Sequence, residues 1–309
     1  MNTMSPTHAP SLGNCHSVIW FCTSAPWTFF ALTVLDLLVA LLGNTTIITF
    51  ISADPQLHSP MYFLLGQLSL MDLLHISTFV PKMALDFLSG DHHISFLGCS
   101  IQMFLFTSLV GTECLLLAVM AYNRYVAICH PLHYPILMRP RVCTLLVLTS
   151  WLNALLNAFI HVIYTMNLPY CASRQIHHFF CEIPHLLKLV CADTSQYEKG
   201  VFVNGVNFLL PPISAVLASY GRILFTVLGM RSSLGLRKTL ATCSSHLTVV
   251  SLFYGSAIFK YFLPKSYHPR EWDEVLSVFY TILTPTLNPL IYSLRNKDIA
   301  RALRKLLRK

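Results

Sequence analysis

Charged residues are scarce in this chain, and their scarcity excludes most water-soluble folds. Only 11% of the 309 residues are Asp, Glu, Lys or Arg, whereas 54% are hydrophobic. Soluble domains carry roughly 25% charged residues. A chain with so few charges cannot cover a globule of this size with polar surface, so we expect lipid to be its solvent.

Sequence motifs for several functions are also missing. The sequence has no H-E-x-x-H or G-x-S-x-G motif and no converging pair of water-facing carboxylates. Nothing in it therefore indicates a membrane enzyme. The sequence also has no internal repeat and no pair of broken helices of the kind that transporters show, which argues against a transporter or channel. The first residues have no basic stretch or clear cleavage site, so we expect no cleaved signal peptide. The N-terminal tail also has no N-x-S/T glycosylation site.

Long apolar runs are what the sequence has in abundance. A membrane-spanning helix needs about 20 mostly apolar residues, and a barrel strand only about 9–11. Because lipid offers no water to backbone groups, runs of this length are expected to be helices. The seven runs are 27–53, 61–88, 98–128, 142–165, 200–228, 240–262 and 274–293. The predicted fold is an all-α membrane protein, a seven-transmembrane-helix bundle over 27–293 between an N-tail, 1–26, and a C-tail, 294–309.

The net charge of +8 is distributed by loop. Lys and Arg gather after the third and fifth runs and in the C-tail, and are absent from the N-tail and from the segment after the second run. The positive-inside rule therefore predicts an N-terminus outside and a C-terminus in the cytosol. In the C-tail, apolar residues recur at helical spacing, which predicts an amphipathic helix on the inner membrane surface. This pattern indicates a lipid-bilayer partner and no nucleic acid.

Four cysteines are expected on the outer side of the membrane. Cys171, Cys181 and Cys191 lie in the long segment 166–199, and Cys99 opens the third run. Four cysteines in an oxidising compartment allow three connectivities. The simplest arrangement joins Cys99 to Cys181 and Cys171 to Cys191; four free thiols are the alternative.

Two further cysteine arrangements are open. Cys15 and Cys22 are both external and close enough in sequence to pair. His178 and Glu182 flank Cys181, and an imidazole, a thiolate and a carboxylate together suit a soft metal ion. That metal site requires a reduced Cys181, which the disulfide arrangement excludes, so we predict no metal there.

Polar side chains inside the apolar runs usually face the interior of a bundle. Asp72, Glu113 and Asn288 lie near the middles of their runs, with Asn44 at a comparable depth. If they converge, they form either a pocket for protons or a cation such as sodium, or a hydrogen-bond network without an ion. Asp36 lies nearer the outer end of its run, where we expect a structural or hydrated role.

Pro289 interrupts the seventh run, where Asn288 can satisfy the backbone group that the proline frees. A kinked helix beside a polar cluster suits a conformational switch, and a static kink is the alternative.

Eight stretches together resemble one family. They are "GN" at 43–44, "LHSPMYFLLGQLSLMDL" at 57–73, "PKM" at 81–83, "MAYNRYVAICHPLHYP" at 120–135, "HFFCE" at 178–182, "SY" at 219–220, "RKTLATCSSHL" at 237–247 and "PTLNPLIYSLRN" at 285–296. In this order and spacing the chain resembles the vertebrate olfactory receptors, terrestrial type (class II), of the rhodopsin-like G-protein-coupled receptors.

The resemblance implies a single receptor domain that binds small volatile odorants and activates a stimulatory olfactory-type G protein, which raises cAMP. It also implies a multi-pass protein of the plasma membrane, in the cilia of olfactory sensory neurons. It assigns coupling and switching to Asn123, Arg124, Tyr125, Tyr220, Lys238, Ser245, His246, Asn288, Pro289 and Tyr292.

The odorant pocket implied by the resemblance is mostly apolar, as small-molecule pockets usually are. Its expected lining is Phe106, Thr107, Val110, Gly111, Asn204, Phe208, Tyr254, Ala257, Ile258 and Tyr261. No amine-binding acid stands among the pocket positions of the third run, so a neutral or weakly polar ligand is expected rather than a charged amine. Lys260 is expected to extend toward the membrane interface.

The chain departs from the family pattern beside Arg124. The family usually has an aspartate there, and this chain has Asn123. The departure predicts a resting state held less firmly, or a receptor that folds but couples poorly.

Overall fold

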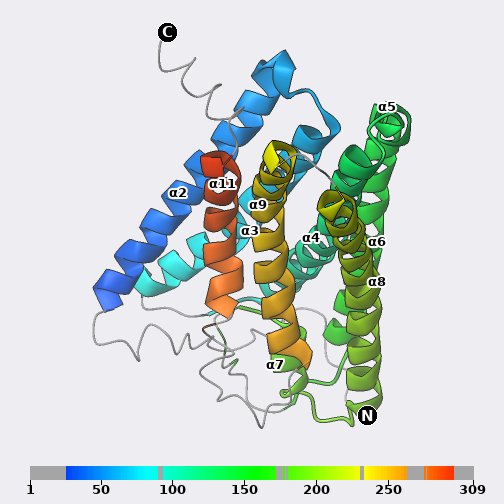
Figure 1. Cartoon of the computed structure of the whole chain (residues 1–309). Helices are drawn as coiled ribbons and strands as arrows, with labels where there is room; N and C mark the ends of the chain where they lie inside the picture. The colour runs from blue at the N-terminus through cyan, green and yellow to red at the C-terminus, as the bar shows by residue number, and fades with distance from the viewer. Residues whose placement is uncertain are drawn as a thin grey trace.

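Long helices form a bundle in the computed structural model (Figure 1). The structure describes residues 26–89, 93–171, 176, 178, 180–229, 233–262, 275 and 277–295. The main helices are α2 (Pro26–Ala53), α3 (Pro60–Ser89), α4 (Phe96–Cys129), α6 (Pro140–Met166), α8 (Ser195–Leu228), α9 (Ser233–Phe262) and α11 (Thr284–Arg295). Short elements connect them: η1 (Pro55–Leu57), α5 (Tyr134–Leu137), α7 (Ile183–Leu187) and the π-helical turn η3 (Phe279–Leu283).

Every predicted apolar run contains helix, so the seven-transmembrane bundle is confirmed. Within the described ranges, α2, α3, α4, α6 and α8 are each long and apolar enough to cross a membrane on their own. The sixth run lies within α9, and the described part of the seventh is helical through η3 and α11. The expected amphipathic C-tail helix and the Cys15–Cys22 pair lie outside the described residues.

Local sequence sets where several helices begin. The Ser95 side chain accepts a hydrogen bond from the Gly98 backbone N–H at 3.0 Å, which caps the first turn of α4. Pro60 and Pro140 are the first residues of α3 and α6, positions at which a missing N–H costs nothing.

Helix α4 lies at the centre of the bundle and packs against α3, α6, α8 and α9, while α11 packs against α2, α3 and α9. Two glycines allow close approach: a Cβ on Gly111 would lie 3.1 Å from the Ala154 Cβ of α6, and one on Gly43 would lie 3.1 Å from the Pro289 ring. The outward faces carry exposed apolar side chains, as a lipid-facing surface requires, including Leu217 and Phe225 on α8.

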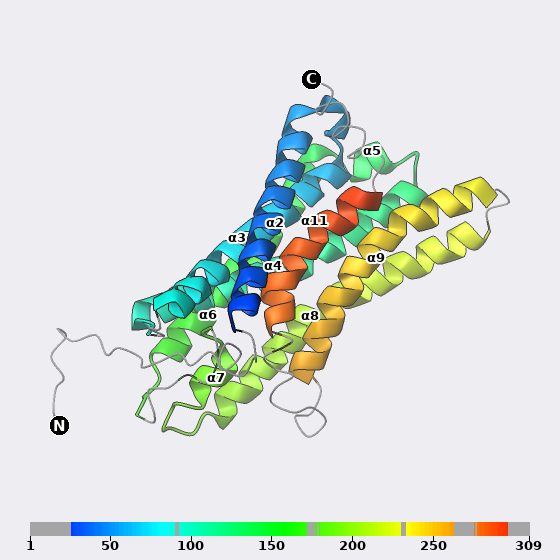
Figure 2. The same cartoon turned by 90° about the vertical axis from the view of Figure 1, so that its left-hand side faces the viewer.

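The segment between α6 and α8 folds over one end of the bundle. Both views place α7 at this end and α5 at the opposite end (Figures 1 and 2). Disulfides join Cys99 to Cys181 and Cys171 to Cys191, with Cα atoms 5.4 Å and 5.8 Å apart. Both pairings are those predicted as the simplest arrangement, and the first ties this segment to the start of α4.

Candidate functional site

A cavity of about 600 Å³ opens between α4, α6, α8 and α9, beneath α7. Much of its wall is apolar, with Phe106 and Val110 from α4 and Phe208 and Leu209 from α8. A small organic molecule with a hydrocarbon body fits the size and character of such a wall.

Polar groups from α6 and α8 form one side of this cavity. The Asn204 side-chain amide donates to the Asn157 side-chain oxygen at 2.8 Å and contacts His161 Nε2 at 2.9 Å. His161 Nδ1 lies 3.1 Å from the Tyr197 hydroxyl. Asn157 and His161 were missed by the sequence prediction, although they lie four residues apart in an apolar run and therefore share one helix face.

A buried ion pair borders the same cavity. Lys260 Nζ lies 2.9 Å from each oxygen of Glu182, and it donates to the Ser277 hydroxyl at 2.8 Å. The expectation that Lys260 extends toward the membrane interface is therefore wrong: a buried carboxylate on the covering segment draws its ammonium group inward. Burial alone would raise the pKa of the Glu182 carboxyl, but Lys260 and the nearby histidines hold that pKa well below its usual value.

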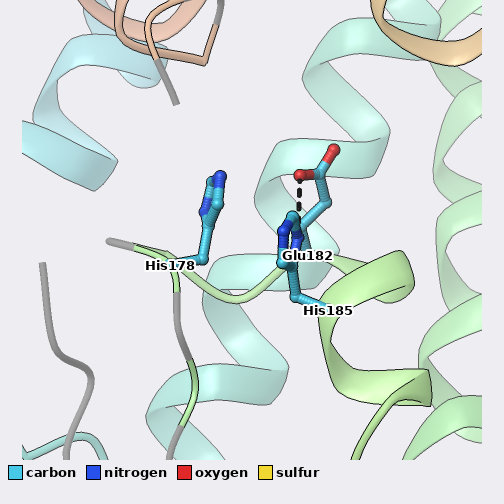
Figure 3. A group of neighbouring side chains, drawn as sticks. All are labelled: His178, Glu182 and His185. Atoms are coloured by element: carbon cyan, nitrogen blue, oxygen red, sulfur yellow. Dashed lines mark ion pairs between the residues drawn. The ribbon is translucent and has the colours of Figure 1, made fainter. Parts of the chain in front are cut away.

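Two histidines lie beside Glu182 (Figure 3). His185 Nδ1 is 3.6 Å from a Glu182 oxygen, and the rings of His178 and His185 are 4.2 Å apart. Potential ligand atoms of the three residues lie within 4.8 Å of one another. The predicted alternative with a Cys181 thiolate is excluded because Cys181 is in a disulfide. Lys260 already neutralises Glu182, so we assign no metal to this cluster.

Part of the polar set predicted inside the bundle converges. Asn288 donates from its side-chain nitrogen to both oxygens of Asp72, at 3.1 Å and 3.2 Å. The Glu113 carboxylate interacts electrostatically with Asp72. Asn44 has a different role: its amide donates to the Ala40 and Pro285 carbonyls and joins α2 to α11.

The opposite end of the bundle carries the residues around Arg124. Asn123 accepts a hydrogen bond from the Tyr134 hydroxyl at 3.0 Å, and its amide contacts Met61 Sδ at 3.3 Å. The Tyr220 hydroxyl lies 2.7 Å from His246 Nδ1, which joins α8 to α9. Other predicted coupling residues at this end of the bundle make separate contacts.

Tyr125 contacts His130 at 2.9 Å, and the Ser245 hydroxyl donates to the Ile291 carbonyl at 3.3 Å. Tyr292 is buried in the main core, and Pro289 lies inside α11. The Lys238 side chain lies outside the described residues.

Comparison with known proteins decides the family. The profile described as olfactory receptor matches residues 33–309. Human olfactory receptor 2AG1 is 58% identical over 278 residues, covering 90% of this chain and 88% of that protein. Human olfactory receptor 2AG2 is 56% identical over 287 residues, covering 93% and 91%. Mouse olfactory receptor 2V1 is 56% identical over 276 residues, covering 89% and 88%.

This chain belongs to the olfactory receptor family. The predicted resemblance is thereby confirmed, and the chain is a multi-pass membrane protein of a receptor family.

Most of the positions that the resemblance assigned to odorant contact do line the cavity of this olfactory receptor. They are Phe106, Thr107, Val110, Gly111, Asn204, Phe208 and Ala257. Tyr254 does not: its ring is buried in the core, and its hydroxyl donates to the Cys114 carbonyl at 2.7 Å. Ile258 lies on another face of α9, and the Tyr261 side chain lies outside the described residues. A role in odorant binding stays a prediction for all of them.

Proposed function

We propose that this olfactory receptor binds small, neutral volatile molecules in the cavity between α4, α6, α8 and α9. The observation that carries the proposal is the 600 Å³ cavity, whose walls are largely apolar and whose buried acid, Glu182, is neutralised by Lys260; Glu198 and Lys188 line its exposed rim. A charged amine would compete with Lys260 for Glu182, and a carboxylate would compete with Glu182 for Lys260. A neutral ligand avoids both costs.

The second part of the proposal is that ligand binding activates a stimulatory olfactory-type G protein and raises cAMP. Arg124 lies near the end of α4 that leads into α5, and α5 lies at the opposite end of the bundle from α7 (Figure 1). Tyr220, which contacts His246, packs in one cluster with Tyr125 and Cys129 of that helix end. The distribution of Lys and Arg supports a cytosolic location for that end. A receptor of this kind acts at the plasma membrane, in the cilia of olfactory sensory neurons.

A cation bound near Asp72 is a further part of the proposal. Among the described residues, Glu113 Oε1 and Asn288 Oδ1 are buried without a hydrogen-bond partner. Oxygen atoms of this kind are the ligands that hard cations prefer, so Asp72, Glu113 and Asn288 would hold sodium. A sodium-dependent shift in the melting temperature of the purified receptor, lost in Asp72→Asn, tests this part.

A cAMP assay in cells with a panel of volatile molecules tests the function. A ligand-dependent rise that disappears in Arg124→Ala, at equal receptor level on the cell surface, supports coupling. A ligand-gated current that persists without any G protein would contradict it and favour a channel.

A further inference from the structure

A chain of hydrogen bonds joins the side chains on the polar side of the cavity. Both hydrogens of the Asn204 side-chain amide are used, one by the Asn157 oxygen and one by His161 Nε2. A nitrogen that accepts cannot carry a proton in neutral imidazole, so His161 Nδ1 carries it. That N–H then donates to the Tyr197 hydroxyl, 3.1 Å away. Turning both amides over and moving the proton to Nε2 satisfies the same contacts, and it also leaves one amide oxygen and one amide nitrogen of the pair unused.

Two polar groups of the Asn157 and Asn204 side chains remain available to bind a ligand. Neither the Asn204 side-chain oxygen nor the Asn157 side-chain nitrogen has a hydrogen-bond partner among the described residues, and both side chains line the cavity. The first group only accepts hydrogen bonds and the second only donates them. A ligand group that donates one hydrogen bond and accepts another would satisfy both.

We propose that Asn157 and Asn204 form a subsite for a hydroxyl group, so that this receptor prefers alcohols over other odorants of the same size. A hydroxyl donates through its O–H to the Asn204 oxygen and accepts through a lone pair from the Asn157 amide. Aldehydes, ketones, esters and ethers accept only, so they leave the Asn204 oxygen unpaired. The hydrocarbon body of the alcohol lies against Phe106, Val110 and Phe208. The inference rests on the proposed function for its ligand site, and names the chemical class that the site takes.

The size of the preference follows from the extra hydrogen bond and from the acceptor that other ligands leave unpaired. Each net hydrogen bond changes affinity severalfold, and an unpaired buried acceptor adds to the difference. We therefore expect an alcohol to bind about 10-fold more tightly than an ether with the same number of heavy atoms.

The test compares 1-octanol with methyl heptyl ether, octanal and nonane, which have equal numbers of heavy atoms. A second set, 2-phenylethanol and benzyl methyl ether, covers a bulkier body with equal numbers of heavy atoms. Binding is measured as the thermal stabilisation of the purified full-length receptor in lipid nanodiscs, and signalling as cAMP in cells. Asn204→Leu and Asn157→Leu each remove one group of the subsite, but each also frees the atom that this group had paired on the other amide. Each single variant should therefore reduce the ratio of alcohol to ether affinity, and the double variant should bring it close to 1.

Asn153→Leu provides the matched control. Asn153 lies one turn before Asn157 on α6, is exposed, and donates to the Thr149 carbonyl of its own helix. The same substitution there should leave the preference for alcohols intact. If Asn204→Leu does not fold, Asn157→Leu serves as the test, because the Asn157 side chain makes a single hydrogen bond in the described part of the chain and its replacement should cost less stability.

The outcomes separate this inference from the proposed function. Equal affinities for alcohol and ether, or a preference that the double variant keeps at full size, overturn the inference, whereas a cAMP response to any probe keeps the proposed function. Alcohol-selective binding without cAMP supports the subsite and contradicts the coupling. Binding of no probe by a receptor that melts cooperatively overturns the subsite.

Discussion

The Asn123 side chain accepts a hydrogen bond from the Tyr134 hydroxyl at 3.0 Å. This bond links the end of α4 to α5, in a position where the family usually has an aspartate next to Arg124. The asparagine keeps the hydrogen bond to the following segment but supplies no negative charge beside the arginine. Asn123 therefore keeps a hydrogen bond with Tyr134 but has no negative charge to attract Arg124.

Restoring the acid should lower basal signalling. In Asn123→Asp, a carboxylate still accepts from Tyr134 and also attracts Arg124, which holds the resting state more firmly. A partly exposed ion pair is worth about 1 kcal/mol, so basal cAMP per surface receptor should fall roughly fivefold. Unchanged basal cAMP and an unchanged surface level would contradict the explanation.

Tyr134→Phe separates the hydrogen bond from the charge. It leaves the Asn123 oxygen without its donor, which should lower the free energy of unfolding by about 1 kcal/mol. Tyr122→Phe, at an exposed tyrosine of the same helix end, is the control and should change neither stability nor basal cAMP.

Breaking the buried ion pair of Lys260 and Glu182 should be costly from either side. Lys260→Met leaves a buried carboxylate without its cation, and Glu182→Gln leaves a buried ammonium without its anion. Each single change should lower the free energy of unfolding by about 3–5 kcal/mol. The double variant should be more stable than the sum of the two single changes predicts, which thermal unfolding in a double-mutant cycle measures. Additive effects would mean that the two charges do not interact.

Acid should weaken the outer end of the receptor in two steps. Burial holds the pKa of His178 well below its usual 6.5. The neighbouring His185 and Lys260 lower this pKa further, and the negative charge of Glu182 opposes the shift. Below pH 6.5 the unfolded chain therefore binds a proton that the folded chain does not, and stability falls. The pKa of Glu182 is held well below its usual 4.5, so its contribution is present above that pH and is lost as the pH falls further toward its folded pKa.

The measurement is the melting temperature of the purified receptor between pH 7.5 and pH 4. His178→Gln should reduce the slope of the first step, to which a single histidine contributes at most about 1.4 kcal/mol per pH unit. Glu182→Gln should flatten the second step. His58→Gln, at an exposed histidine, should alter neither. Equal slopes in the wild type and in His178→Gln would show that His178 does not cause the first step.

Packing between α4 and α6 should be sensitive at Gly111. A methyl group there would lie 3.1 Å from the Ala154 Cβ, closer than ordinary carbon contacts. Gly111→Ala should therefore lower the free energy of unfolding by about 1–3 kcal/mol, despite the better helix propensity of alanine.

Ala154→Gly in the same chain removes the opposing methyl group and should recover part of that loss. Thermal unfolding of the two single variants and the double variant measures the coupling. No recovery in the double variant would place the cause of the destabilisation elsewhere than in this contact.

Several features were predictable from sequence because they depend on local composition. The seven helices follow from runs long enough to cross a bilayer, and the helix ends follow from Ser95 and the two leading prolines. Both disulfides were predictable as the simplest connectivity once topology had placed four cysteines on one side. That Asp72 and Asn288 face the interior of the bundle was predictable from the cost of leaving a polar side chain in lipid, whereas their contact stayed a conditional expectation.

What the sequence determined by itself is the solvent, the number of spans and the family, because each depends on residue types and on their order along the chain. Only the tertiary structure decided which side chains face one another. It directed Lys260 inward to Glu182, buried Tyr254 in the core away from the cavity, and brought Asn157 and His161 against Asn204. These outcomes depend on the rotation of each helix about its axis and on contacts between residues tens of positions apart, which are selected by packing and by the cost of unpaired buried polar groups.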